Sequence, residues 1–187
     1  MKNVTRVSES LAGLPPIIDA SVETLILGSF PSPASLAARQ YYAHRQNQFW
    51  RIMGALLGES LTEFDYPEKQ RALLRHGVGV WDVYRRCARE GALDSAIRAA
   101  EPNDFSVLRE LAPHLKRVCF NGKTSGKFER WFSENAYATR VLPSTSPAYT
   151  LAFEEKMKRW REGVSGDRRQ RTGDRAAFGL RSQVSVI

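Results

Sequence analysis

The chain has 187 residues, 42% of them hydrophobic, which is typical of one soluble domain with a sizeable core. No apolar run approaches the roughly 20 residues that span a bilayer, and no apolar stretch precedes Pro15, so the sequence indicates neither a membrane protein nor a secreted one. A formal charge of +8 suits a polyanionic partner such as DNA, and we expect a cytoplasmic protein.

The first predicted element is a buried strand that runs into a tight loop. Residues 1–21 predict an irregular leader. Residues 24–27 form a short apolar run that ends at Gly28, and two prolines follow within five residues. Ligands bind at the carboxyl ends of strands in open α/β sheets, so the loop at residues 28–35 is the first candidate for a site.

Residues 41–50 combine aromatic rings with polar side chains. The segment holds four rings beside a histidine, an arginine and three amides. One interpretation is an aromatic helix that packs on the sheet. The other is a wall of stacking rings around a polar catalytic group, as a pocket for a flat heterocycle requires. Residues 48–57 predict an amphipathic helix.

A second strand carries an acidic residue near its end. Residues 59–67 predict a loop, residues 68–75 a short helix, and residues 78–83 a buried strand. Asp82 interrupts the apolar run of this strand. It either caps the following turn or faces a ligand beyond the strand.

Strands and helices alternate along the rest of the chain. The pattern predicts a loop that includes residues 94–98 and 101–104, a helix at 105–115, a strand at 117–120, a helix at 123–132, a strand at 137–142 and a closing helix from 149 to 162. This alternation predicts a three-layer α/β/α fold around a central, mostly parallel, four-stranded sheet. We expect one catalytic domain over residues 1–163. Residues 164–187 hold five arginines and two aspartates and predict a flexible basic extension.

The cysteines and histidines do not form a recognisable metal motif. Cys87 and Cys119 lack the spacing of a metal or redox pair, so buried free thiols are expected. The three histidines lie far apart in the sequence. We expect no metal and no other cofactor.

Three segments resemble the hypoxanthine-DNA glycosylases, a branch of the uracil-DNA glycosylase superfamily. They are Gly-Ser-Phe-Pro-Ser (28–32) with Tyr-Tyr-Ala-His-Arg-Gln-Asn-Gln-Phe-Trp (41–50), Gly-Val-Gly-Val-Trp-Asp-Val-Tyr (77–84), and Leu-Pro-Ser-Thr-Ser-Pro-Ala (142–148). The resemblance covers about residues 12–163. Two positions depart from relatives: Ser32 stands where many carry glycine, and Leu142 stands where classical uracil glycosylases carry histidine.

The resemblance implies a role for each candidate site residue. The family's catalytic asparagine falls on Asn47, whose amide oxygen can position a water; the alternative is a local bond within a turn. The implied base-binding residues are Gly28, Ser29, Phe30, Tyr41, Tyr42, His44 and Asp82, with one of the two tyrosines in the core. The implied DNA-binding loop holds Ser144, Thr145, Ser146 and Pro147, which a plain turn would also explain.

The leading hypothesis is therefore a monofunctional DNA glycosylase that removes hypoxanthine from DNA as a monomer. Its substrate would be double-stranded or single-stranded DNA that contains deaminated bases. Within the same class, uracil or xanthine could be the main substrate. A different class is a non-catalytic nucleic-acid-binding α/β module. A small-nucleotide enzyme is a third hypothesis, but the chain has no glycine-rich phosphate loop.

Overall fold

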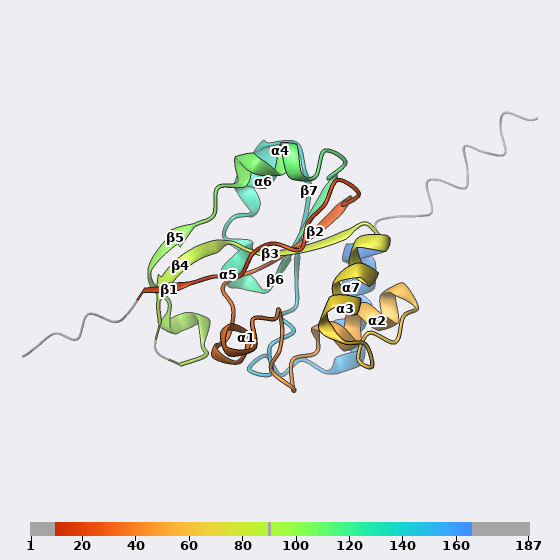
Figure 1. The fold of residues 1–187 in the computed structure, drawn as a ribbon, viewed down its shortest axis with the longest axis horizontal. Coiled ribbons are helices and arrows are strands. Elements are labelled where there is room, and N and C mark those ends of the chain that lie inside the picture. The colour runs from red at the N-terminus through yellow and green to blue at the C-terminus, as the bar shows by residue number, and fades with distance from the viewer. Residues whose placement is uncertain (1–9, 90, 166–187) are drawn as a thin grey trace, which may run out of the picture.

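Four parallel strands form the centre of the fold, which a computed structural model describes for residues 10–89 and 91–165 (Figure 1). They are β2 (Thr24–Gly28), β3 (Val78–Asp82), β6 (Arg117–Asn121) and β7 (Ala138–Leu142), in the spatial order β3-β2-β6-β7. Every pair is parallel and in register, so the carboxyl ends of the strands lie at one edge of the sheet. The prediction of a four-stranded parallel sheet is confirmed.

Helices cover both faces of this sheet. On β2, Ile26 points into one hydrophobic cluster, whereas Leu25 and Leu27 point into another, because successive side chains of a strand face opposite ways. The first cluster is closed by α2 (Phe49–Leu57), α3 (Tyr66–Arg75) and α7 (Phe153–Ser165). The second is closed by η2 (Phe105–Val107), α4 (Leu108–Leu111) and α6 (Glu129–Glu134). The predicted three-layer architecture is confirmed.

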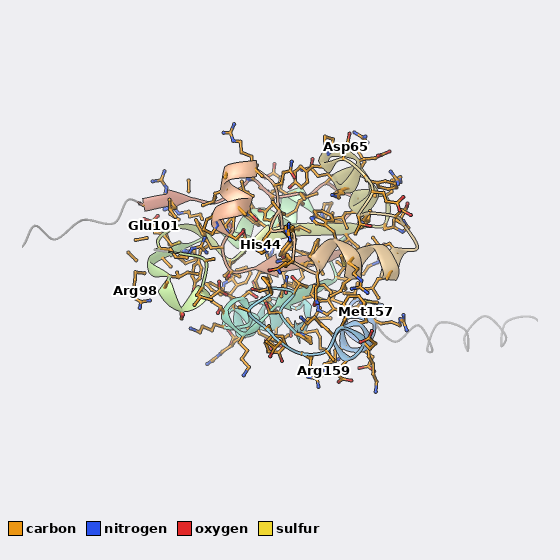
Figure 2. The ribbon with its side chains drawn as sticks, turned by 90° about the horizontal axis from the view of Figure 1, so that it is seen from below. His44, Asp65, Arg98, Glu101, Met157 and Arg159 are labelled. Carbon is orange, nitrogen blue, oxygen red and sulfur yellow. The ribbon has the colours of Figure 1, made fainter. Side chains whose placement is uncertain are left out.

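A second, antiparallel sheet lies at one end of the molecule (Figure 1). It consists of β1 (Ser10–Ala12), β4 (Tyr84–Ala88) and β5 (Arg98–Pro102), in the order β1-β4-β5. The sequence prediction was wrong here, because it placed an irregular leader over β1 and a loop, at residues 94–98 and 101–104, over most of β5. Figure 2 shows Arg98 and Glu101 of β5 at the margin of the molecule. Most β5 side chains are exposed, so the strand has no apolar alternation to reveal it.

Several helices differ from their predicted bounds. The helix α1 (Pro33–Ala38) begins inside the predicted loop 28–35 and extends three residues beyond it, and Ser32 caps the helix by accepting a hydrogen bond from the Ser35 amide at 3.2 Å. Asp65 caps α3 in the same way, and α3 begins at Tyr66, two residues before the predicted start at residue 68. The helix predicted at residues 123–132 is two short helices, α5 (Lys123–Gly126) and α6.

The carboxyl-terminal helix is tied to the sheet up to its last turn. Arg117 Nη1 donates to the carbonyl oxygen of Val164 at 2.9 Å, and a Cβ on Gly163 would collide with Leu142. Helix α7 therefore extends past the predicted domain end at residue 163. The rest of the predicted extension, residues 166–187, lies outside the described residues. Within the described part of the chain, none of the helices has both the length and the apolar character to cross a membrane.

Candidate active site

A cavity of about 300 Å³ opens at the carboxyl edge of the parallel sheet. All four strands contribute to it, through the residues at or just beyond their ends: Gly28 and Ser29 after β2, Asp82 of β3, Asn121 of β6, and Ser144, Thr145 and Ser146 after β7. The remaining wall comes from the loop around Tyr42 and Asn47 and from residues 92–95 beside the second sheet. The parallel topology brings the four strand ends together, and the loop before α2 and the β4–β5 connection complete the wall.

Gly28 and Asp82 lie opposite each other on adjacent strands and meet at the cavity floor. They are register partners in the β2–β3 pair. A Cβ on residue 28 would collide with Asp82 Oδ1 and would lie 3.3 Å from the hydroxyl of Tyr42. Glycine is therefore required here by the close approach of a carboxyl group rather than by its backbone angles.

Asp82 is a buried carboxyl group with an unsatisfied oxygen. Its side chain is 4% exposed, and Oδ2 has no hydrogen-bond partner among the described residues. Burial, with a smaller contribution from the nearby charge of Asp94, raises the pKa of Asp82 to about 8, and Arg89 opposes this rise. The group is therefore mostly a neutral acid at pH 7. The backbone carbonyl of Asp82 accepts from Asn103 Nδ2 at 2.9 Å, so the strand end is fixed.

Tyr41 and Tyr42 have different surroundings. Tyr41 is buried in the core, where its hydroxyl donates to the Leu14 carbonyl at 3.2 Å. Tyr42 has a left-handed backbone, with φ of 55°, and its ring stacks on Phe49 with centroids 3.9 Å apart. The Tyr42 hydroxyl is buried and forms no hydrogen bond of good geometry with the described residues, although the side chain of Asn121 lies near it and acts to lower its pKa. Both residues line the cavity, but only Tyr42 brings a free polar group to it.

Asn47 lies on the cavity wall just before helix α2. Its side-chain Oδ1 accepts a hydrogen bond from the backbone N–H of Phe49 at 3.0 Å. The backbone N–H of Asn47 donates to the His44 carbonyl at 2.7 Å. The local bond that the sequence analysis held as the alternative is thus present. It does not exclude a role in chemistry, because an amide oxygen has two lone pairs and can accept from a water as well.

A loop that leads from β4 to β5 closes one side of the cavity mouth. Asp94, in the short helix η1 (Asp94–Ala96), accepts a hydrogen bond from Ser29 Oγ at 2.7 Å. Arg89 donates to the Pro31 carbonyl, and its guanidinium lies 5.3 Å from the centre of the Phe30 ring. The connection between β4 and β5 therefore fixes the segment at residues 28–32 through Ser29 and Pro31. Phe30 is buried and lines the cavity.

The loop after β7 is anchored by Asn121, the last residue of β6, which directly follows the strand predicted at residues 117–120. Asn121 Nδ2 donates to Thr145 Oγ1, and Asn121 Oδ1 accepts from the Thr145 amide, both at 2.9 Å. Thr145 is fully buried, so its hydroxyl fixes the loop instead of facing solvent. Ser144 and Ser146 line the cavity, whereas Pro147 is exposed outside it. The same signal that identified Asp82, a polar residue at the end of a strand, could have identified Asn121.

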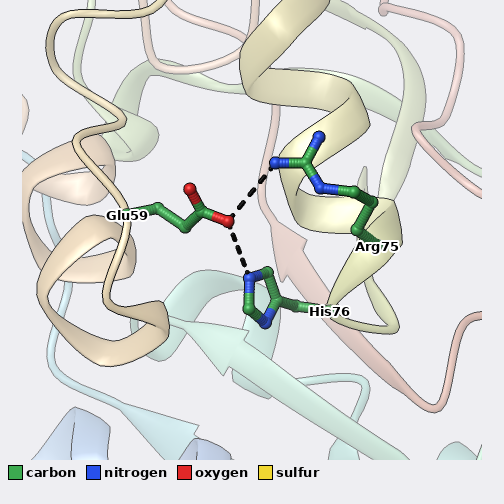
Figure 3. Close-up of polar contacts among 3 residues, drawn as sticks. All are labelled: Glu59, Arg75 and His76. Carbon is green, nitrogen blue, oxygen red and sulfur yellow. Dashed lines mark hydrogen bonds and ion pairs between the residues drawn. The ribbon is translucent and has the colours of Figure 1, made fainter.

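His44 and His76 lie outside the cavity. His44 is half-buried on the loop between α1 and α2 (Figure 2), and its Nδ1 accepts from the Gln46 amide at 3.3 Å. The structure does not bring it to the predicted base-binding group. His76 lies 3.0 Å from Glu59 Oε1, which also accepts from Arg75 at 3.3 Å (Figure 3). The hydrogen bond from His76 is the main cause that lowers the pKa of Glu59.

The residues from 15 to 164 match the family model described as "Uracil DNA glycosylase superfamily". The chain belongs to this superfamily. It is 42% identical over 150 residues to the hypoxanthine DNA glycosylase of Methanosarcina barkeri, covering 80% of this chain and 95% of that protein. The hypoxanthine DNA glycosylase of Methanosarcina acetivorans is 40% identical over 148 residues, covering 79% of this chain and 94% of the relative.

A solved structure shares the superfamily fold. It is a solution NMR structure of a Methanosarcina acetivorans protein described as a candidate uracil DNA glycosylase, with a TM-score of 0.76 and 39% identity. The alignment covers 82% of this chain and 95% of that chain. The family resemblance stated from the three sequence motifs is confirmed.

A second cavity, of about 680 Å³, adjoins the first and shares Asp94, Ser144 and Tyr149 with it. Its wall also holds three basic side chains, Lys123, Arg140 and Arg159. Arg159 forms an ion pair with Glu155 at 2.8 Å. Within the described residues no group of three or more histidines, cysteines or acidic residues is placed to hold a metal ion.

Proposed function

We propose that this protein is a monofunctional DNA glycosylase that hydrolyses the N-glycosidic bond of hypoxanthine in DNA and leaves an abasic site. The observation that carries the proposal is the narrow cavity at the strand ends, which has Asn47 on its wall and the polar groups of Asp82 and Tyr42 at its floor. Two relatives that share at least 40% identity over most of this chain are named hypoxanthine DNA glycosylases.

In this proposal the damaged nucleotide leaves the stack and its base enters the cavity. Flipping exposes the sugar carbon that water must attack. Phe30 and Tyr42 offer aromatic surface to a flat heterocycle, and Gly28 lets the base approach the strand end. The cavity, of about 300 Å³, is large enough for a purine base.

Asn47 positions the attacking water. Its Oδ1 is held by the Phe49 amide, and the second lone pair accepts from the water. An amide is a poor proton acceptor, so Asn47 acts by orientation and not as a general base. No lysine lines the wall described for this cavity, which supports hydrolysis by water over a covalent amine intermediate.

The loop after β7 contacts the DNA backbone in this proposal. Ser144 and Ser146 present small hydroxyl groups at the cavity, and Pro147 is exposed beside them. Such groups bond phosphate oxygens and fix the register of a protein on DNA without reading sequence. Thr145 keeps the loop in place through its two bonds to Asn121.

The test uses end-labelled DNA that carries one inosine, uracil or xanthine, as duplexes and as single strands, followed by alkali to cut abasic sites. The expected result is cleavage chiefly at inosine. Asn47→Ala should lower the rate at least about a hundredfold, the scale at which loss of correct positioning is felt, and should keep most of the DNA affinity. Asn135→Ala is a matched control, because Asn135 is bonded to Trp131 at the surface.

Each competing hypothesis has its own outcome in this assay. Stronger cleavage at uracil or xanthine would keep the enzyme class and replace the substrate. Tight DNA binding without cleavage on any substrate would support the non-catalytic binding module. Full activity of Asn47→Ala would remove Asn47 from the mechanism.

A further inference from the structure

Two buried polar side chains, Asp82 and Tyr42, meet beside Gly28 at the first cavity. Asp82 Oδ2 is buried and has no hydrogen-bond partner among the described residues. The Tyr42 hydroxyl is buried and forms no hydrogen bond of good geometry with them, although the nearby Asn121 side chain acts to lower its pKa. Both side chains line the cavity and approach the same point above Gly28. A buried polar group without a partner costs about 1–3 kcal/mol, so two such groups in one cavity indicate a ligand that completes their bonding.

The surroundings of Asp82 favour its protonated form. Five titratable or charged groups face it: Tyr41 and Tyr42 from the loop before α2, Tyr66 from α3, Arg89 after β4, and Asp94 from η1. Only Arg89 opposes protonation, and its guanidinium is bonded to the Pro31 carbonyl. Among the described residues no ion pair to Asp82 is formed. Burial likewise raises the pKa of Tyr42, which keeps its proton.

We propose that Asp82, as a neutral carboxylic acid, and Tyr42, as a phenol, form a pair of O–H donors that stabilise negative charge on the departing base. The favoured substrate class is a base with a carbonyl oxygen, which can accept both hydrogen bonds. This inference rests on the proposed glycosylase function and assigns the leaving-group side of that reaction. Asn47, on the wall of the same cavity, serves the water side.

The step balances without a proton from either donor. The bond between the sugar carbon and the base nitrogen breaks, and its electron pair goes to the base. The oxygen of the water that Asn47 holds bonds to the sugar carbon and releases one proton to solvent. The base leaves as an anion, with charge on its carbonyl oxygen, and is protonated from solvent. Asp82 and Tyr42 keep their protons throughout and act as fixed donors.

An ionised Asp82 would have the opposite effect. A carboxylate at the cavity floor would repel the anionic base as it forms, and it would have no proton to donate. The neutral-acid role therefore predicts that excision slows as the pH rises through the pKa of Asp82, which is about 8. A role as general base predicts that excision speeds up over the same range.

The experiment is a single-turnover pH profile, from pH 6 to pH 10, for the full-length protein on an inosine duplex. Above pH 8 the wild-type rate should fall toward tenfold per unit. Asp82→Asn retains an N–H donor that does not titrate, so its rate should lie within about tenfold of the wild type at pH 7 and stay flat above pH 8. Any titration of the inosine itself affects both proteins and cancels in their ratio.

Two further variants separate the donors from the fold. Asp82→Ala should lower the rate about a hundredfold or more, and Tyr42→Phe about tenfold to a hundredfold, the range seen when one preorganised donor is lost. Affinity for a duplex with a hydrolysis-resistant 2′-fluoroarabino inosine should change less than about threefold. Asp19→Asn, in an exposed turn, is the control for a neutralised aspartate.

Three results would overturn the inference: a wild-type rate that rises through pH 8, an inactive Asp82→Asn protein that still binds the resistant duplex, or wild-type activity in Tyr42→Phe. If Asp82→Asn did not fold, the wild-type profile and Tyr42→Phe would still decide. Absence of excision at every pH by the wild-type protein would instead contradict the proposed function itself.

Discussion

At the scale of single residues, Gly28 is a position with no room for a side chain. A Cβ there would meet both Asp82 and Tyr42. Gly28→Ala should therefore displace the carboxyl group, destabilise the protein by about 1–3 kcal/mol as overpacking does, and abolish excision. The double variant Gly28→Ala/Asp82→Ala removes the collision. It should recover most of the stability in a urea titration but none of the activity; recovered activity would contradict the role given to Asp82.

Asp82 should also make the free energy of unfolding depend on pH. Its folded-state pKa of about 8 lies above the unfolded value of about 3.9, so the folded protein holds an extra proton between these limits. The free energy of unfolding then falls as the pH rises from about 4 toward 8, by at most about 1.4 kcal/mol per unit from this group. Urea titrations at pH 5, 6 and 7 should show that Asp82→Asn gains stability relative to the wild type as the pH rises. A constant difference would contradict the raised pKa.

The residues at strand ends show what a sequence can and cannot predict about a site. Gly28 and Asp82 stood out because a glycine or a carboxyl group breaks an apolar run, and the structure places both at the cavity. Asn121 ends an apolar run in the same way, but Gly122 follows it, and an Asn-Gly pair is equally typical of a plain turn. Its bonds to Thr145, 24 residues away in the sequence, exist only in the folded chain. Local pattern contains no information on such pairs.

At the scale of elements, the parallel strands were predictable and the second sheet was not. Strands buried on both faces read as continuous apolar runs, as residues 24–27 do. By contrast, β5 is mostly exposed, and β1 has only three residues. Their pairing with β4 depends on backbone bonds between distant segments. The missed sheet matters for function, because its connecting loop forms part of the cavity mouth.

That loop carries an exposed apolar side chain beside the cavity. Leu93 is 57% exposed and lies on the cavity wall next to Asp94. Apolar side chains inserted between base steps help to unstack a duplex. Leu93→Ala should therefore slow excision from a duplex by about tenfold and leave excision from a single strand within about twofold of the wild type.

The matched control for this element is Leu111→Ala, which removes a leucine that is 41% exposed on α4. Leu111→Ala should change the excision rate neither on a duplex nor on a single strand. Placing an abasic site opposite the inosine weakens the stacking that must be broken, and it should restore part of the Leu93→Ala rate. An equal loss on duplex and single strand would assign Leu93 to packing of the mouth instead.

At the scale of the whole molecule, residues 166–187 carry three of the eight net positive charges, and residues 1–165 carry the other five. The cavity floor is neutral or acidic, with Asp82 and Asp94. The described domain and residues 166–187 share the formal charge of +8, and the latter segment holds five arginines against two aspartates. Affinity for the phosphate backbone grows with neutralised charge, whereas choice of base depends on contacts in the cavity. The two properties should separate by truncation.

The truncation should begin at residue 166, because the carbonyl of Val164 accepts from Arg117 and α7 runs through Ser165. Each phosphate contact contributes about 0.9 to the slope of log affinity against log salt concentration, so loss of five arginines should lower that slope by up to about 4. The order of rates on inosine, uracil and xanthine should not change. A full-length protein with these arginines changed to glutamine should behave like the truncated one, since charge and not length is removed. If the base preference changed in either protein, the extension would have to reach the cavity, and the separation of charge from base choice would fail.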